Sequence, residues 1–174
     1  MAIIGVDIRR RIGMNRFLCG LVVLTICSLP CKADETDNVQ MVRAMTEAIN
    51  SRDLGALDAI VAPNVVRHSA ATPGVVVTNL GEFRAFLEAD FSAVPDSVQI
   101  IDIIFGSGDF VAVRARYVGT QSGPMGPYPA SGNKLELPYM GIVRFEDNKI
   151  AELWVEWDNL HILTQLGHFP PPGD

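Results

Sequence analysis

The sequence KLELPYMGIVRFEDNKIAELWVEWD, residues 134–158, contains the clearest secondary-structure signal in this chain. Two runs rich in β-branched and alternating apolar residues, Lys134–Glu146 and Lys149–Asp158, flank the dipeptide Asp147-Asn148. Such runs are typical of strands, and a two-residue Asp/Asn connection favours a hairpin turn. We therefore predict two antiparallel strands here.

Two more strands are predicted upstream, over Val98–Phe105 and Phe110–Gly119, with the turn Gly-Ser-Gly-Asp at 106–109 between them. A loop at 119–133, which holds four glycines and three prolines, leads into the next strand. The four strands thus follow one another as an antiparallel meander.

Helical spacing of apolar residues dominates the part of the chain before residue 95. Helices are predicted over Thr36–Ser51, from the cap Asp53 to Val61, over Leu80–Val94 and, at the other end, over Leu160–Leu166; Pro63 and Asn64 would end the second helix, and Val65–His68 would form a short strand. Helices first and strands after them is an α+β order. We expect a curved antiparallel sheet packed on three N-terminal helices, forming a cone with one apolar pocket.

Residues 1–33 differ from the rest of the chain. They contain five of the 14 basic residues, one acid and an uncharged apolar run at 17–29, and they end in the small residue Ala33. This pattern predicts a secretory signal peptide, with translation from Met1 or Met14, and a domain over 34–174. A misassigned start, an uncleaved anchor and lipidation are the alternatives. The expected location is secreted or periplasmic, without membrane contact after the leader is removed.

Charge and cysteine content narrow the function of the remaining 141 residues. They carry 9 basic and 19 acidic residues, a net charge of −10, and none of the three cysteines. A negative domain is a poor partner for nucleic acid. Thiol chemistry is excluded, and no phosphate-binding or dinucleotide-binding motif is present. We expect acid–base chemistry without a cofactor.

The last predicted strand places Glu152, Trp154, Glu156 and Asp158 on one face, because strand side chains repeat every two residues. Three carboxylates cannot all enter an apolar core, so this face is either solvated or lines a cavity, and Trp154 favours a cavity wall. Asp158 stands where a strand gives way to a helix. It is either the N-cap of that helix or a general base in an apolar pocket.

The histidines do not form a metal motif. His68, His161 and His168 lack any close ligand spacing, so no metal site is expected. His68 ends an apolar strand and is either a pocket base or a partly exposed strand-end residue.

An ordered set of residues resembles the SnoaL-like polyketide cyclase family, also called ester cyclases, of the nuclear transport factor 2-like superfamily. The set comprises Val66-x-His68, Pro95-Asp96, Gly108-Asp109-x-Val111-Ala112, Gly119-Thr120-Gln121, Gly132, Arg144-Phe145, Lys149-Ile150, Glu152-x-Trp154, Asp158 and Gln165-Leu166-Gly167. The resemblance implies a cone with a deep pocket, and ring closure by aldol condensation without metal or cofactor. It also implies that Asp158 takes a proton from an acidic carbon and returns it to oxygen, with His68 assisting.

Two departures concern the substrate. Gln121 and Leu153 stand where many members have histidine, and the leader would carry the protein away from intracellular polyketide synthesis. We therefore expect an exported enzyme for a small apolar carbonyl compound or ester. Asp158 and His68 would be catalytic, and Trp154, Gln121, Glu156 and Met140 would line the pocket. The alternatives are a dehydratase, isomerase or epoxide-hydrolase variant and a non-catalytic protein that binds a small hydrophobic ligand. A homodimer is also expected.

Overall fold

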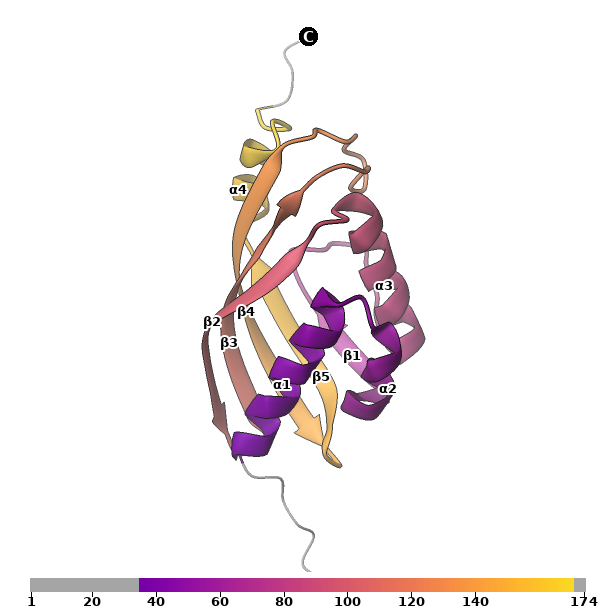
Figure 1. Ribbon diagram of the computed structural model, residues 1–174, viewed down its shortest axis with the longest axis vertical. Helices are drawn as coiled ribbons and strands as arrows, with labels where there is room; N and C mark the ends of the chain where they lie inside the picture. The colour runs from indigo at the N-terminus through magenta and orange to yellow at the C-terminus, as the bar shows by residue number, and fades with distance from the viewer. Residues whose placement is uncertain (1–34, 171–174) are drawn as a thin grey trace, which may run out of the picture. The chain divides into compact units, whose positions relative to one another are not determined.

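The computed structural model describes residues 35–170 (Figure 1). The predicted signal peptide, residues 1–33, lies outside the described residues. In the described part of the chain, no helix is both long and apolar enough to cross a membrane.

Five strands form one sheet in the order β1-β5-β4-β3-β2. Their bounds are Val61–His68 for β1, Val98–Ser107 for β2, Phe110–Thr120 for β3, Lys134–Glu146 for β4 and Lys149–Trp157 for β5. Neighbours from β2 to β5 are antiparallel, which confirms the predicted meander. The edge strand β1 runs parallel to β5, so the sheet as a whole is mixed.

The β4–β5 turn has the predicted conformation. Asp147 and Asn148 have φ angles of 49° and 58°, the left-handed values that a two-residue hairpin turn requires and that these residue types tolerate. The two runs that flank this turn therefore pair as the antiparallel strands β4 and β5, with one shift of register between Arg144 and Phe145.

Strand β1 begins earlier than the sequence indicates. Pro63 and Asn64 were expected to end a helix, but both lie within β1, which starts at Val61. The pairing with β5 shifts register between Val61 and Val66. Proline has no N–H to donate, and an edge strand with such an irregularity is where a sheet can accommodate it.

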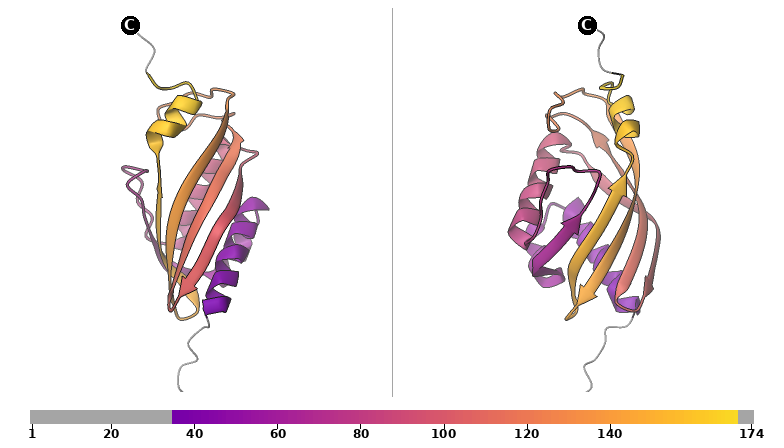
Figure 2. Two further views of the ribbon diagram at one scale, coloured as in Figure 1. Left: turned by 90° about the vertical axis from the view of Figure 1, so that its left-hand side faces the viewer. Right: turned by 180° about the vertical axis from the view of Figure 1, so that it is seen from behind.

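The helices match the predicted positions to within one or two residues, except that the second is a 3-10 turn followed by a short helix. They are α1 (Glu35–Asn50), the 3-10 turn Leu54–Ala56, α2 (Leu57–Ile60), α3 (Leu80–Ala93) and α4 (Asn159–Gln165). Helices α1, α2 and α3 cover the inner face of the curved sheet, and α4 lies at the end of β5 (Figures 1 and 2). This is the α+β arrangement that the sequence predicts.

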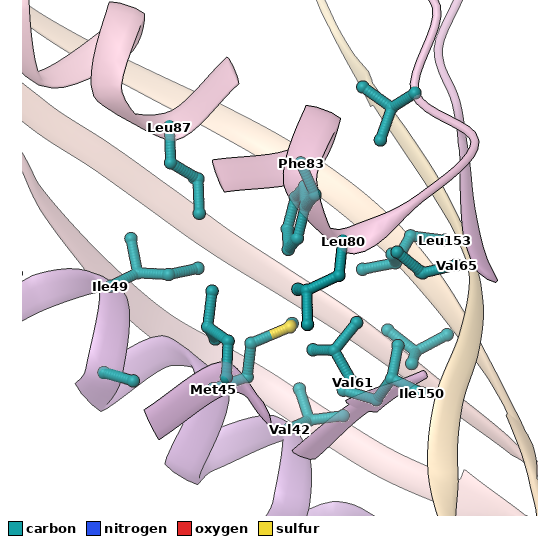
Figure 3. Close-up of a cluster of buried hydrophobic side chains, with 14 of the residues drawn as sticks. Val42, Met45, Ile49, Val61, Val65, Leu80, Phe83, Leu87, Ile150 and Leu153 are labelled. Atoms are coloured by element: carbon teal, nitrogen blue, oxygen red, sulfur yellow. The ribbon is translucent and has the colours of Figure 1, made fainter. Parts of the chain in front are cut away.

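Two apolar clusters fill the space between helices and sheet. The larger one joins α1, α3, β1 and β5, and Figure 3 labels ten of its residues: Val42, Met45, Ile49, Val61, Val65, Leu80, Phe83, Leu87, Ile150 and Leu153. The smaller one joins the end of α3 to β4 and α4, and consists of Ala93, Val94, Leu135, Leu137, Ile162 and Leu166. Phe86 packs against the larger cluster and Trp157 against the smaller. Both rings also lie close to the guanidinium of Arg67.

Candidate active site

Strand β5 presents its carboxylates to the outer face of the sheet, away from the helices. Leu153 belongs to the larger core cluster and Val155 packs against it, and Glu152, Trp154 and Glu156 alternate with them. Of the two alternatives that the sequence left open for this face, the structure therefore has the solvated one, in agreement with the cost of burying carboxylates.

Three of the predicted site residues meet in one open depression on this face, which we call the rim hollow. It has a volume of about 430 Å³ and is lined by Arg114, Pro138, Tyr139, Met140, Glu156, Trp157 and Asp158. The carboxylate of Glu156 also accepts hydrogen bonds from the backbone N–H groups of Ala70 and Ala71, at 2.8 and 3.2 Å. Glu156 thereby fixes the loop that follows β1.

Asp158 is the N-cap of α4. Its Oδ1 accepts hydrogen bonds from the N–H groups of Leu160 and His161, at 2.9 and 3.1 Å, as the cap interpretation requires. Its Oδ2 makes no hydrogen bond to any residue in 35–170. The cap therefore leaves one oxygen of this exposed carboxylate available, and the catalytic role of Asp158 stays a prediction.

His68 and Trp154 are neighbours on the outer face, because β1 and β5 pair in parallel at these two residues. Their rings stack with centroids 5.2 Å apart. His68 Nε2 lies 2.7 Å from Glu152 Oε1, and Arg144 Nε donates to Glu152 Oε2 at 2.9 Å. These two partners hold the pKa of Glu152 below its usual value. His68 is thus tied to a carboxylate at the strand end.

Trp154 also lines a second depression, the apolar hollow, of about 460 Å³. The other lining residues are Phe105, Ser107, Phe110, Ala112 and Ile142. The predicted cavity wall is therefore the wall of an open depression on the outside of the sheet.

Gln121 lies apart from the other predicted residues. It is fully buried, its Nε2 donates to the carbonyl of Pro129, and its Oε1 accepts from the N–H of Ser131. His168 Nε2 lies 3.1 Å from the same Oε1. The amide is thus engaged by the 119–133 loop and the chain end, and its contact with a substrate stays a prediction.

The inner face carries an acidic group that the sequence analysis did not single out. Both oxygens of Asp90, on α3, lie 3.0 Å from the hydroxyl of Tyr117, on β3. Burial raises the pKa of Asp90 to about 6, although the Tyr117 hydroxyl and the charges of Arg52 and Arg67 oppose this shift. Burial and Asp90 together raise the pKa of Tyr117, which keeps its proton. The pair resembles a general base with a fixed hydrogen-bond donor.

A buried cation lies near this pair. Arg67, on β1, is only 7% exposed, and its guanidinium lies 4.4 Å from the ring centre of Phe86 and 5.7 Å from that of Trp157. Its Nη1 donates to Thr72 Oγ1 at 3.0 Å. We call Arg67, Asp90 and Tyr117 the inner cluster. A carboxylate, a hydroxyl and a cation on one face can move a proton and stabilise the negative charge that results.

The sequence does contain a signal for the inner cluster. Asp90 follows Phe86 and Leu87 by four and three residues, which places it on the buried face of α3. Arg67 follows the buried Val65 by two residues on β1, which places it on the inner face of that strand. Charged residues at apolar positions were thus the available clue.

Within residues 35–170, no group of three or more His, Cys, Asp or Glu side chains is arranged to hold a metal ion. The site is therefore described through its own acids, bases and hydrogen-bond donors.

A family model described as SnoaL-like polyketide cyclase matches residues 39–166. The chain belongs to this family. Among solved structures, TsrD from Streptomyces laurentii is 28% identical, with a TM-score of 0.69 over 78% of this chain and 98% of TsrD. IdmH from Streptomyces antibioticus is 27% identical, with a TM-score of 0.66 over 75% of this chain and 98% of IdmH.

The fold is also found at lower identity. An epoxide hydrolase from M. tuberculosis is 14% identical, with a TM-score of 0.62 over 77% of this chain and 92% of that chain. No curated protein sequence matches this SnoaL-like chain. The family and the nuclear transport factor 2-like fold implied by the sequence resemblance are thus confirmed.

Proposed function

We propose that this protein is an exported enzyme that catalyses cofactor-free proton transfer at a carbon next to a carbonyl, in the ring closure or isomerisation of a small carbonyl compound or ester. Membership of the SnoaL-like family supports the reaction class. Such a carbon is already acidic, so one carboxylate in a partly desolvated setting can remove its proton.

The observation that carries the proposal is the Asp90–Tyr117 pair. A carboxylate with a pKa of about 6 is a stronger base than an ordinary aspartate and is still mostly ionised at pH 7. The Tyr117 hydroxyl, 3.0 Å from both oxygens, donates its one hydrogen to the carboxylate and so fixes the orientation of the base.

Asp158 is the second carboxylate to be weighed, because the resemblance implies it as the catalytic residue. Its free Oδ2 could act as the base at the rim hollow, where Glu156 and Met140 would contact the ligand. His68 would assist only if it left Glu152, its present partner. The two carboxylates make different predictions, and one experiment separates them.

That experiment measures exchange of the α-hydrogens of ethyl acetoacetate and related β-keto esters for deuterium in D2O, followed by proton NMR. If Asp90 is the base, Asp90→Asn should slow the enzyme-dependent exchange about 100-fold or more, and Asp158→Asn should leave it nearly unchanged. The matched control is Asp58→Asn, because Asp58 is an exposed aspartate paired with Arg84.

The opposite pattern, loss of exchange in a folded Asp158→Asn variant alone, would move the base to Asp158. An absence of exchange with every ester would contradict the enzymatic proposal itself.

A non-catalytic role in binding a small hydrophobic ligand is favoured by one observation, the almost wholly apolar lining of the hollow beside Trp154. A hydrophobic molecule that co-purifies with the native protein in mass spectrometry, together with an absence of exchange activity, would support this second function.

A further inference from the structure

Arg67 is a buried cation without an anionic partner. In residues 35–170 no carboxylate lies within ion-pair distance of its guanidinium, and its only side-chain hydrogen bond is from Nη1 to Thr72. Its Nε and Nη2 make no hydrogen bond to a described residue. Buried charges are normally paired, because removing them from water is costly. Arg67 is thus a largely buried charge whose two free donors are satisfied by solvent alone among the described residues.

The surroundings of Arg67 limit what can pair with it. The rings of Phe86 and Trp157 lie 4.4 and 5.7 Å from the guanidinium, and the edge formed by Nε and Nη2 keeps contact with solvent. Two adjacent N–H donors on one edge fit the two oxygens of a carboxylate.

We propose that Arg67 anchors a carboxylate group of the ligand, held next to an aromatic or conjugated carbon framework that lies against Phe86 and Trp157. The inference rests on the proposed function and refines its substrate class, from a neutral apolar carbonyl compound to a carbonyl compound that bears a carboxylate. Arg67 and Asp90 interact electrostatically, so the arginine and the proposed base belong to the same region of the inner face.

The charges around Arg67 agree with this assignment. Glu156 and Asp90 both act on Arg67 through space, yet burial still lowers its pKa, so the neighbouring acids do not offset its desolvation. A bound carboxylate would supply the missing negative charge at hydrogen-bonding distance. The alternative is that Arg67 serves only to hold the loop after β1 through Thr72.

The two alternatives are separated by a binding experiment that needs no turnover. The chain has two tryptophans, so Trp154→Phe leaves Trp157, beside Arg67, as the only indole reporter. Benzoate and benzamide, which have the same shape and differ in charge, are titrated against the fluorescence of this variant. We expect saturable binding of benzoate at least tenfold tighter than that of benzamide.

Further substitutions in the Trp154→Phe protein then test whether the guanidinium of Arg67 is the group that binds benzoate. Arg67→Met should weaken benzoate binding tenfold or more, and Arg67→Lys should recover part of it, because the charge stays and the paired donors are lost. Arg116→Met, on the outer face and paired with Asp102 and Glu136, is the matched control and should bind benzoate like its parent.

Equal affinity for benzoate and benzamide in the parent protein would overturn the proposal without any variant having to fold. So would unchanged benzoate binding in a folded Arg67→Met. If benzoate binding shows no charge selectivity but deuterium exchange is intact, the carboxylate anchor is wrong and the proposed proton transfer still stands. If binding is charge-selective but no exchange occurs, only the proposed enzymatic activity is contradicted.

Discussion

Asp90 is a carboxylate whose ionisation the fold opposes. Its folded pKa of about 6 lies above the unfolded value of 3.8, so this group favours the folded state below pH 4 and the advantage is lost as the pH rises through 6. Glu82, Asp96 and Glu152 have lowered pKa values and act in the opposite sense. The contribution of Asp90 to the free energy of unfolding must therefore be measured by comparing the parent protein with a variant that lacks this carboxylate.

We predict that Asp90→Asn gains stability relative to the parent protein as the pH rises from 4 to 8. A shift of about two pKa units corresponds to about 3 kcal/mol of unfolding free energy. Urea unfolding of both proteins at several pH values measures the difference. If the difference in unfolding free energy stays constant between pH 4 and pH 8, the pKa of Asp90 is not raised by burial.

The residue scale is also where sequence reasoning reached its limit. Asp158 could be placed at a strand–helix junction because its neighbours define the junction locally. Asp90 and Tyr117 lie on α3 and β3, which are remote in sequence, and no local pattern specifies the distance between them. A charged side chain such as that of Arg67 is ordinarily expected to be exposed to solvent. Only its place among the alternating apolar residues of a strand indicates that it faces the core.

At the scale of elements, α4 depends on its cap. We predict that Asp158→Ala lowers the free energy of unfolding by about 1 kcal/mol, because two N–H groups of α4 lose their acceptor, and that Asp158→Asn changes it by only a few tenths. Thermal unfolding of the two variants measures this. Equal stability of Asp158→Ala and the parent protein would exclude the cap as a source of stability.

The elements themselves were largely predictable. Asp147-Asn148 identified the β4–β5 hairpin because the turn requires left-handed backbone that few residue types adopt. Pro63 was misassigned because proline is a stop signal in helices and central strands alike. Its place in an edge strand depends on β5, which is remote in sequence, so local rules could not reveal it.

At the scale of the whole molecule, one part of the outer face of the sheet, on β2, β3 and β4, is unusually apolar. Phe105 and Met140 are 61% and 67% exposed, and Ile103, Phe110 and Ile142 are exposed beside them. A contiguous apolar surface of this kind is uncommon on a monomer. We propose that this face pairs with that of a second copy of the chain.

Light scattering coupled to gel filtration should accordingly give twice the mass of one chain. Phe105→Lys combined with Phe110→Lys should give the monomer, because two charges would enter the apolar contact. Val76→Lys, at a 73% exposed position in the loop after β1, is the control and should remain dimeric. A monomeric parent protein would contradict the proposal.

The parallel pairing of β1 with β5 has a consequence for how the protein is made. Strands β2 to β5 join neighbours in sequence, whereas Arg67 pairs with Leu153 only after β2, β3 and β4 have been synthesised. Contacts between such distant segments form late, because a long loop must close first. A nascent chain that has not yet extended through β5 offers β1 no strand to join. Arg67 is therefore fixed in the sheet only at the end of synthesis, and a chain that stops before β5 leaves its strand without a partner.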